Sequence, residues 1–483
     1  MNRAANAPVG TPEPAEYAAW LGGDKGHDKE HGKAQGRGSA RQRKRTIADL
    51  ACFGGAPLFA EIRSTSNLVQ PPQDAFFAAV SEAFETGRLA TGRGPCVARL
   101  EARLAKLHEA EHCVTFCNGL WAIVLALRCL KLPGRDQVVM PSLTYRRLAD
   151  IAAWAGLTPH FCDVCPETLA VDTQTIGACV NDSTAALLIA HPIVNLCDVQ
   201  AIESFAAQRG LPLLFDAVEA AHASWGGRML GSFGDAECYS MHASKFLNAF
   251  EAGYVTTNNG DLAERLRTLR SGDAVKDLAN ADWVPGFEAP LNELHAAMAC
   301  ASLDDLQDQI GRNLERHRRY AAALVGPPGL TRVACDGGPA GAPGLTRVAC
   351  DGGPIGVNGI ELVRYAEPSS GEIRTFKNTL VRLTSAWPLS RDQSIELLHA
   401  ENLLVRPYYS PPLHHKPAAY ATICGELPVT DRLSREYLLL PCGEFLRLEE
   451  IDRIGELLAF VEQHGSAIAA RLSSRGSACG GAA

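Results

Sequence analysis

Apolar residues recur at helical spacing in the first third of the chain. Between Gln73 and Ala110 the apolar side chains stand three or four positions apart, and the turn Thr91–Pro95 interrupts them. Because an α-helix turns once every 3.6 residues, this spacing predicts two amphipathic helices. The positions that define them are Phe76, Phe77, Val80, Phe84, Val97, Leu100, Leu104 and Leu107.

Short apolar runs then alternate with helical stretches. Runs of this length, bounded by polar residues and separated by helices, predict buried strands of a mostly parallel α/β sheet. The sequence therefore predicts a large α/β domain over residues 51–304. Its strand candidates are 138–140, 159–164, 185–190, 211–215 and 254–257.

A second α/β region carries its own apolar pattern from about Leu306 to Gly465 and closes with a helix over Leu448–Gln463. We expect a small C-terminal domain over residues 305–470 and a flexible tail over 471–483. Within the small domain, residues 328–339 recur without change at 343–354. Two identical copies are not a solenoid, which needs at least three diverged repeats, so 328–354 is predicted to be a duplicated surface loop or an assembly artefact of the sequence.

The first 50 residues differ from the rest of the chain. No Val, Ile, Leu, Met, Cys or aromatic residue occurs from Gly22 to Arg45, and residues 1–50 hold nine Lys or Arg against six Asp or Glu. Such a segment buries too little apolar surface to offset its ordering entropy, which predicts a disordered basic tail over 1–50. A solvated tail is favoured over a nucleic-acid patch for the run Arg41–Arg45.

Composition narrows the class of protein. The 483 residues carry a formal charge of −8, which argues against a protein that coats nucleic acid. Neither a membrane-spanning apolar segment nor a secretory signal is evident, so the 16 cysteines are expected to be reduced thiols of a cytoplasmic protein. Cys162 and Cys165 lack the further ligands that a structural zinc needs, and no metal site is predicted.

Three motifs could carry chemistry, and each has a simpler alternative. The turn Asn118-Gly119 opens onto an apolar helical stretch, whose free N–H groups suit a phosphate, although most such pairs are only turns. Asp216 follows a buried strand, where it could face a ligand or cap a helix. Lys245 stands among small residues and is either a surface lysine or a semi-buried nucleophile with a lowered pKa.

Taken together, these motifs meet the needs of pyridoxal 5'-phosphate (PLP). A lysine holds the aldehyde as a Schiff base, a carboxylate keeps the pyridine nitrogen protonated, and a helix N-terminus holds the phosphate. The sequence also resembles the DegT/StrS family of PLP-dependent aminotransferases from about Phe53 to Val461. The matching stretches are SMHASKFLNAFEAG around Lys245, FDAVEAAHA around Asp216, MPSLTY at 140–145, NELHAAMA at 292–299 and VRPYYSPPLH at 405–414.

The resemblance implies the fold type I architecture, with a large, mostly parallel sheet of the seven-stranded type and a smaller C-terminal α/β domain. It also implies a homodimer and assigns a role to each matching residue. Lys245 would bind PLP and shuttle the proton, and Asp216 would pair with the pyridine nitrogen. The other cofactor contacts implied are Tyr145 on the ring, Glu219 beside the cofactor, and Ser240 with the amides of Gly119 and Leu120 on the phosphate.

Substrate contacts and the reaction follow from the same resemblance. Arg406 and His414 would line the substrate pocket, and His191 matches a family histidine of uncertain role. Because Lys245 stands where a dehydratase branch has His, transamination is favoured. The expected donor is an amino acid, commonly glutamate in this family, and the expected acceptor is a keto group of a nucleotide-linked sugar or similar polyhydroxy ketone.

Several positions depart from the family pattern and keep a second hypothesis open. Leu120 lacks the hydroxyl that members usually offer to the phosphate, and Ala252 replaces a glycine. Glu288 stands where members tend to have Asn near the neighbouring subunit's phosphate. These departures also suit a non-catalytic PLP- or sugar-binding relative that acts as a regulator or partner subunit. The further departures are Val194, Leu196 and Val218.

Overall fold

The computed structural model describes residues 43–66, 71–89, 94–276, 283–325, 357–363 and 373–479, and these belong to one unit that begins at Arg43. The duplicated segment 328–354 and the first 42 residues of the predicted tail lie outside the described residues.

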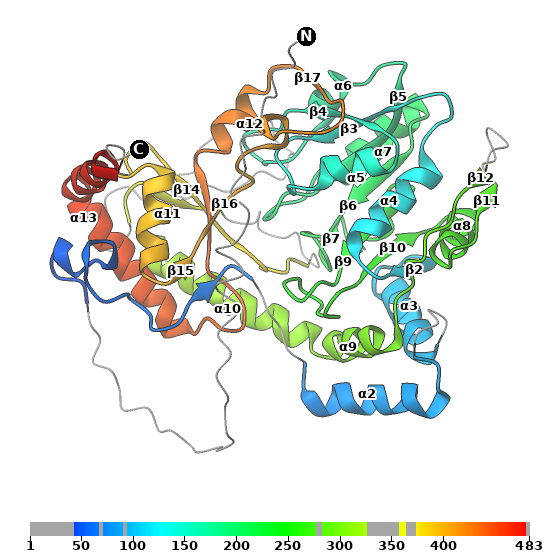
Figure 1. Ribbon diagram of the computed structural model, residues 1–483, viewed down its shortest axis with the longest axis horizontal. Helices are drawn as coiled ribbons and strands as arrows, with labels where there is room; N and C mark the ends of the chain where they lie inside the picture. The colour runs from blue at the N-terminus through cyan, green and yellow to red at the C-terminus, as the bar shows by residue number, and fades with distance from the viewer. Residues whose placement is uncertain are drawn as a thin grey trace, which may run out of the picture. The chain divides into compact units, whose positions relative to one another are not determined.

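The central element is an eight-stranded sheet (Figure 1). Its strands are β2 (His112–Phe116), β3 (Gln137–Pro141), β4 (Thr158–Cys162), β5 (Thr184–Ala190), β6 (Leu213–Asp216), β9 (Ala236–Ser240), β10 (Gly253–Thr257) and β17 (Ile423–Cys424). In the sheet they follow the order β17-β4-β3-β5-β6-β9-β10-β2, and all neighbours are parallel except that β10 runs antiparallel to β9 and β2. The predicted mostly parallel α/β fold is confirmed, and the two-residue β17 adds an eighth strand from the C-terminal region.

Helices cover both faces of this sheet, which explains why its strands are apolar along their whole length. Along β3, Val138 and Met140 pack into one core cluster with α4 (Gly119–Leu130), α5 (Leu148–Trp154) and α8 (Gly260–Arg270). Val139 between them packs into the opposite cluster with α6 (Thr173–Gly177) and α7 (Val199–Arg209). Successive side chains of a strand point to opposite faces, so each face of the sheet needs its own helical layer.

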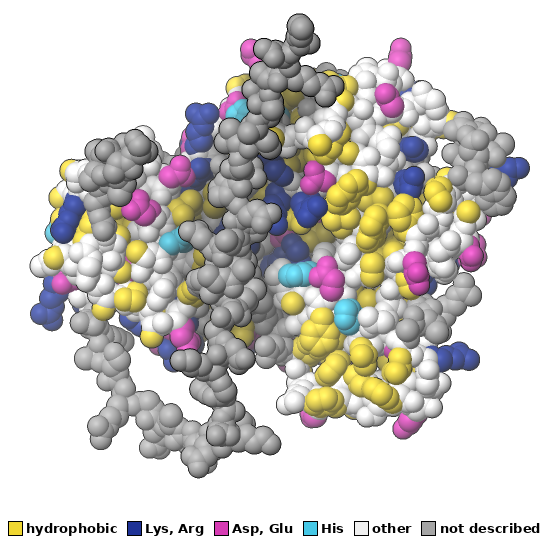
Figure 2. Space-filling view, viewed as in Figure 1, with side chains coloured by type: hydrophobic (Ala, Val, Ile, Leu, Met, Phe, Trp, Pro, Cys, Tyr) yellow, Lys and Arg dark blue, Asp and Glu magenta, His cyan; other side chains and the backbone are white. Residues whose placement is uncertain are grey.

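The two helices predicted near the start of the sheet domain are α2 (Gln73–Thr86) and α3 (Pro95–Leu107). Both pack against α9 (Glu293–Asp304), whose buried Glu293 accepts hydrogen bonds from the Cys96 and Val97 amides at 2.7 and 3.1 Å. The periodic face of α2 is only partly covered, because Phe77 and Phe84 are 54% and 61% exposed. Figure 2 shows hydrophobic side chains gathered over this helix.

A second, antiparallel sheet is built mainly from the C-terminal region. Its strands are β13 (Ile360–Leu362), β14 (Thr379–Leu383), β16 (Arg406–Pro407) and β18 (Tyr437–Leu440), in the order β13-β14-β18-β16. They share a core cluster with α10 (Leu306–Val325), α11 (Arg391–Ala400) and α13 (Leu448–Cys479). The predicted boundary at residue 304/305 falls between α9 and α10 and stays a prediction.

The remaining elements are short. They are the 3-10 helices η1 (Ile47–Asp49), η2 (Ala51–Phe53) and η3 (Leu413–His415), helix α12 (Pro428–Leu433), and the two-residue strands β1 (Arg63–Ser64), β7 (Ser224–Trp225), β8 (Arg228–Met229), β11 (Val275–Lys276), β12 (Trp283–Val284) and β15 (Leu403–Leu404). No helix among the described residues is long and apolar enough to cross a membrane.

The start of the described chain packs with the C-terminal elements rather than with the large sheet. Strand β1 pairs in parallel with β15, and Leu50 is fully buried in the C-terminal core cluster. Lys44 forms an ion pair of 2.7 Å with the buried carboxylate of Glu401. The prediction of a disordered tail to residue 50 is therefore wrong for residues 43–50, because Glu401 and an apolar core supply partners that the local sequence does not show.

The last helix also extends past its predicted end. Helix α13 continues from Leu448 to Cys479, whereas a helix ending at Gln463 and a flexible tail from residue 471 were predicted. Ile468 and Leu472 carry the buried face onward, with exposed fractions of 0% and 5%. Their burial against the C-terminal core explains why the helix does not stop at Gln463.

Candidate active site

Lys245 lies in the turn after β9, at the carboxyl end of the strand. Its amide donates to the carbonyl of His242 at 2.7 Å, and its side chain is 21% exposed. The ammonium Nζ lies 2.5 Å from Oε1 of Glu219, which follows the neighbouring strand β6. The end of a parallel strand thus presents the lysine to a carboxylate on the next strand, where open α/β sheets place their ligands.

Glu219 binds two ammonium groups at once. Its Oε2 lies 2.6 Å from Nζ of Lys377, in the segment before β14, and also accepts a hydrogen bond of 3.3 Å from the side-chain amide of Asn378. Burial by itself would raise the pKa of Glu219, but the charges of Lys245 and Lys377 lower it well below its usual range. The carboxylate is therefore ionised and joins the large sheet to the C-terminal region.

This pairing reverses the expected behaviour of Lys245. A semi-buried lysine was predicted to have a lowered pKa, and burial does act in that direction. The charge of Glu219 and its hydrogen bond outweigh burial, so the pKa of Lys245 is raised. The prediction is wrong for the chain without cofactor, because it considered the local sequence and not the carboxylate across the strand.

Asp216 ends strand β6 and is 6% exposed. Its carboxylate accepts one hydrogen bond of 3.2 Å from the Val218 amide, and burial raises its pKa to about 6. The residues after it form turns rather than an α-helix, so Asp216 does not cap a helix. Among the described residues, the Val218 amide is the one hydrogen-bond donor that reaches this carboxylate, so the buried group suits a protonated ring nitrogen, which would place a positive charge beside it.

The N-terminus of α4 forms a cradle of backbone groups. Asn118 caps the helix by accepting the Trp121 amide at 2.9 Å, which leaves the amides of Gly119 and Leu120 in the unbonded first turn. A Cβ at Gly119 would lie 2.9 Å from Cβ of Ser240, at the end of β9. Glycine thus lets the helix start approach Ser240, and the three predicted phosphate contacts lie together at a site that fits an anion.

Tyr145 follows β3 in a loop that a histidine anchors. The tyrosine is 41% exposed, and the side chain of Ser142, three residues before it, forms a 2.7 Å hydrogen bond with Nδ1 of His414. The other ring nitrogen of His414 lies 3.1 Å from Asp431. His414 therefore holds the loop that carries Tyr145, and its predicted contact with substrate stays a prediction.

The same histidine belongs to a cluster of possible ligands. One donor atom from each of His414, His415 and Asp431 lies within 4.8 Å of the others. Hydrogen bonds or close contacts already join Asp431 to both imidazoles, at 3.1 and 3.3 Å. The geometry thus has an explanation without a metal ion, and the prediction of no metal stays a prediction.

The structure also places the remaining predicted residues. Arg406 is exposed in β16, where its backbone pairs with Leu439, and its role in substrate binding stays a prediction.

His191 is buried after β5, and its ring stacks on Phe215. Its Nδ1 accepts a hydrogen bond of 3.1 Å from the Cys197 amide, while its Nε2 has no hydrogen-bond partner among the described residues. Burial lowers the pKa of His191 to about 3, so the ring is neutral.

Two site residues escaped the sequence analysis. Lys377 reaches Glu219 from a segment with no recognisable motif, so only the fold reveals it. Tyr409 lies within the matching stretch 405–414, and burial together with the negative charge of Glu219 raises the pKa of its phenol. That stretch could have pointed to Tyr409, since a tyrosine pair precedes its prolines.

One departure from the family pattern has a simple structural explanation. Ala252, which replaces a glycine of the family pattern, is fully buried and has no positive φ. The left-handed residue of this loop is Phe250, with φ of 60°. Alanine at position 252 therefore introduces no backbone strain.

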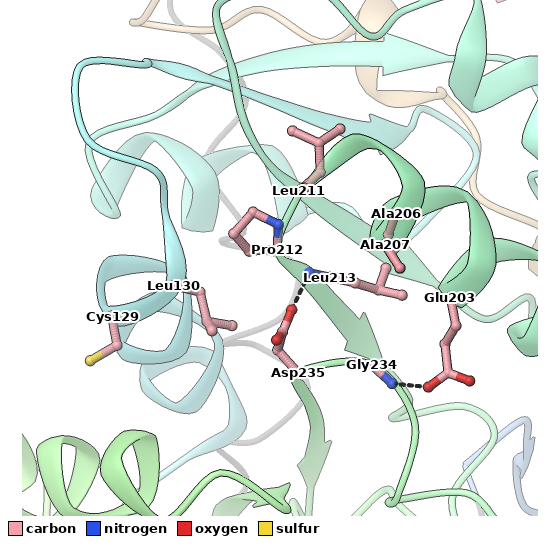
Figure 3. A pocket seen from close by; sticks show the side chains of 11 residues that line it. Cys129, Leu130, Glu203, Ala206, Ala207, Leu211, Pro212, Leu213, Gly234 and Asp235 are labelled. Atoms are coloured by element: carbon pink, nitrogen blue, oxygen red, sulfur yellow. Dashed lines mark hydrogen bonds between the residues drawn. The ribbon is translucent and has the colours of Figure 1, made fainter.

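A surface pocket of about 560 Å³ lies at the other end of the sheet (Figure 3). It is lined by residues at the amino ends of β6 and β9, including Pro212 and Asp235. Its two acidic side chains already accept backbone amides, Asp235 from Leu213 and Glu203 from Gly234, both at 2.7 Å. The pocket is thus separate from the site at the carboxyl ends of the same strands.

Comparison with known proteins places the chain in a family. The pattern of the DegT/DnrJ/EryC1/StrS aminotransferase family matches residues 72–350 and 358–459. The chain belongs to this family. Its fold is that of the PLP-dependent aminotransferases, and its cofactor is PLP.

Individual relatives are similar over different lengths. Spore coat polysaccharide biosynthesis protein SpsC of Bacillus subtilis (strain 168) is 32% identical over 261 residues, which are 52% of this chain and 67% of the relative. GDP-perosamine synthase of Caulobacter vibrioides is 27% identical over 366 residues, or 75% and 88% of the two chains. The crystal structure of DesI in the presence of its TDP-sugar product superposes with a TM-score of 0.76 at 29% identity, covering 89% of this chain and 100% of that one.

Proposed function

We propose that the protein transfers an amino group from an amino acid, with glutamate the expected donor, to a keto group of a nucleotide-linked sugar or similar polyhydroxy ketone. Membership of the aminotransferase family supports the reaction. The sugar assignment is supported by the names of two relatives, GDP-perosamine synthase and a DesI structure described with a TDP-sugar product. The cytoplasm stays the predicted compartment.

The contact between Lys245 and Glu219 carries the proposal. A lysine held 2.5 Å from a buried carboxylate, beside Asp216, is equipped to hold and move a proton at Nζ. When bound, PLP supplies an electron sink that stabilises negative charge on the carbon next to nitrogen. Lys245 would bind its aldehyde, Asp216 would keep the ring nitrogen protonated, and the amides of Gly119 and Leu120 with Ser240 would hold its phosphate.

Spectroscopy and trapping test this assignment. The purified protein with PLP should be yellow, and borohydride should fix the label on the Lys245 peptide. Glutamate should then convert the cofactor to its amine form, with glutamine and alanine as comparison donors, and a nucleotide-linked keto sugar should restore the yellow form. If PLP binds but no amino donor converts it, the alternative of a non-catalytic relative would replace this proposal.

We further propose that the protein is a homodimer joined through the α2 face. Phe76 lies 5.6 Å from Phe77 and 5.9 Å from Phe250, measured between ring centroids, so the half-buried Phe76 connects the exposed Phe77 of α2 to the loop that follows Lys245. Phe77, Phe84 and Phe250 are 54%, 61% and 45% exposed, which is more apolar surface than isolated side chains require (Figure 2). Light scattering should give twice the chain mass, and the F77E/F84E variant should shift it toward the monomer.

A further inference from the structure

Lys377 is an unusual neighbour for a cofactor-binding lysine. It comes from the C-terminal region, whereas Lys245 and Glu219 follow strands of the large sheet. Its side chain is 6% exposed, and its Nζ lies 2.6 Å from Oε2 of Glu219, while Lys245 binds the other oxygen at 2.5 Å. A buried and a half-buried ammonium group therefore share one carboxylate.

This arrangement bears on how Lys245 can lose its proton. The amine must be neutral to attack an aldehyde or to accept a proton. If Lys245 were the only cation beside Glu219, its deprotonation would leave a buried carboxylate without a counter-charge, which is strongly unfavourable. Lys377 removes that difficulty, because it stays paired with Glu219 when Lys245 becomes neutral.

We propose that Lys377 is a positioning residue that stays paired with Glu219 and holds it in place, so that Lys245 can release its proton and react. The inference rests on Lys245 being the PLP lysine and deepens the proposed function. It makes Lys377 part of the reacting site although it lies 132 positions away from Lys245 in the sequence.

The surroundings support this role. Burial lowers the pKa of Lys377, and the positive charge of Lys245 lowers it further, against the effect of Glu219. The two lysines thus compete for one carboxylate, and each weakens the proton affinity of the other. The other titratable groups whose charges act on this cluster are Asp216, Tyr145, Tyr408, Tyr409 and Cys442.

The test measures the proton affinity of Lys245 itself. The full-length chain without added cofactor is labelled with trace acetic anhydride between pH 8 and 11, and acetylation of the Lys245 peptide is quantified by mass spectrometry against a free-amine standard. Below the midpoint the labelling rate is proportional to the neutral fraction of the amine, so a midpoint one pH unit higher gives a rate about tenfold lower at the same pH. In K377M the midpoint of Lys245 labelling should rise by about one pH unit, because Glu219 then has Lys245 as its remaining ammonium partner. K377R, which keeps the charge, should retain the original midpoint, and so should the exposed control K106M.

A second comparison holds even if K377M does not fold. In the E219Q background the carboxylate is absent, so the charge of Lys377 acts on Lys245 directly, and E219Q/K377M should label with a higher midpoint than E219Q. An unchanged or lower midpoint on removal of Lys377 in either background would overturn the inference. Because labelling needs neither donor nor keto sugar, this result is independent of whether the proposed substrate is correct.

Discussion

A Cβ on Gly253 would lie 2.3 Å from the backbone nitrogen and Cα of Gly119, where β10 passes the first turn of α4. We therefore expect G253A to push α4 away from its place, to lower stability by about 1–3 kcal/mol and to weaken PLP binding. Denaturant unfolding and a PLP titration measure the two effects. G311A is the control, since its added carbon meets nothing within 4 Å in α10 and should stabilise that helix by about 0.5–1 kcal/mol. Equal stability and equal PLP affinity of G253A and G311A would contradict the close approach of β10 to α4.

Asp216 should destabilise the chain when PLP is absent. Its folded pKa of about 6 exceeds the ordinary value of 3.8, because burial favours the neutral acid. The folded state therefore binds this proton more tightly than the unfolded chain, and stability falls as the pH rises from about 4 to 6. Above about pH 6 the buried charge lowers the free energy of unfolding by about 3 kcal/mol, since each unit of pKa difference corresponds to about 1.4 kcal/mol.

The D216N variant tests this penalty. Without PLP it should unfold at a higher denaturant concentration than the unsubstituted chain at pH 8, with a smaller difference at pH 5, and it should bind PLP more weakly. The exposed D182N variant should show neither effect. A D216N chain that loses stability at pH 8 would mean that the carboxylate has a stabilising partner.

Glu293 should contribute to stability through two backbone amides. The side chain is fully buried and accepts from Cys96 and Val97 at the start of α3. In E293Q one oxygen is replaced by an NH₂ group that cannot accept, which should cost about 1–3 kcal/mol in urea unfolding. E264Q removes a glutamate whose side chain is 76% exposed and should change stability little. An E293Q chain as stable as the control would argue against this capping role.

Lys44 should matter although it lies in a segment predicted to be disordered. Its ammonium pairs with Glu401, and their side chains are 6% and 0% exposed. K44M leaves the buried carboxylate with two backbone amides and no cation, so we expect a loss of about 3 kcal/mol. Thermal unfolding of K44M against R45M, an exposed neighbour, measures the effect. Matching melting temperatures for K44M and R45M would show that the ion pair between Lys44 and Glu401 adds nothing to stability.

The sequence predicts those parts of the fold whose signals are local. The run 185–190 lies within β5 because both faces of that strand are covered, and continuous apolar character is what such burial requires. Asp216 and Lys245 could be predicted as site residues because the motifs around them are intact in the chain. Lys377 was missed, and the pKa of Lys245 was predicted in the wrong direction, because both depend on contacts of Glu219 with segments that are distant in the sequence. Long-range charge contacts leave no pattern in a single sequence.

The pairing of β1 with β15 has a consequence for how the chain is made. The amides of Ala51 and Leu58 donate to Glu401, which lies 350 and 343 positions further along. On the ribosome, these early residues emerge long before their partners are synthesised, whereas the large sheet can assemble as its strands appear. The segment translated first among the described residues is thus among the last to reach its native contacts, and a nascent chain halted before residue 401 should leave it open to protease.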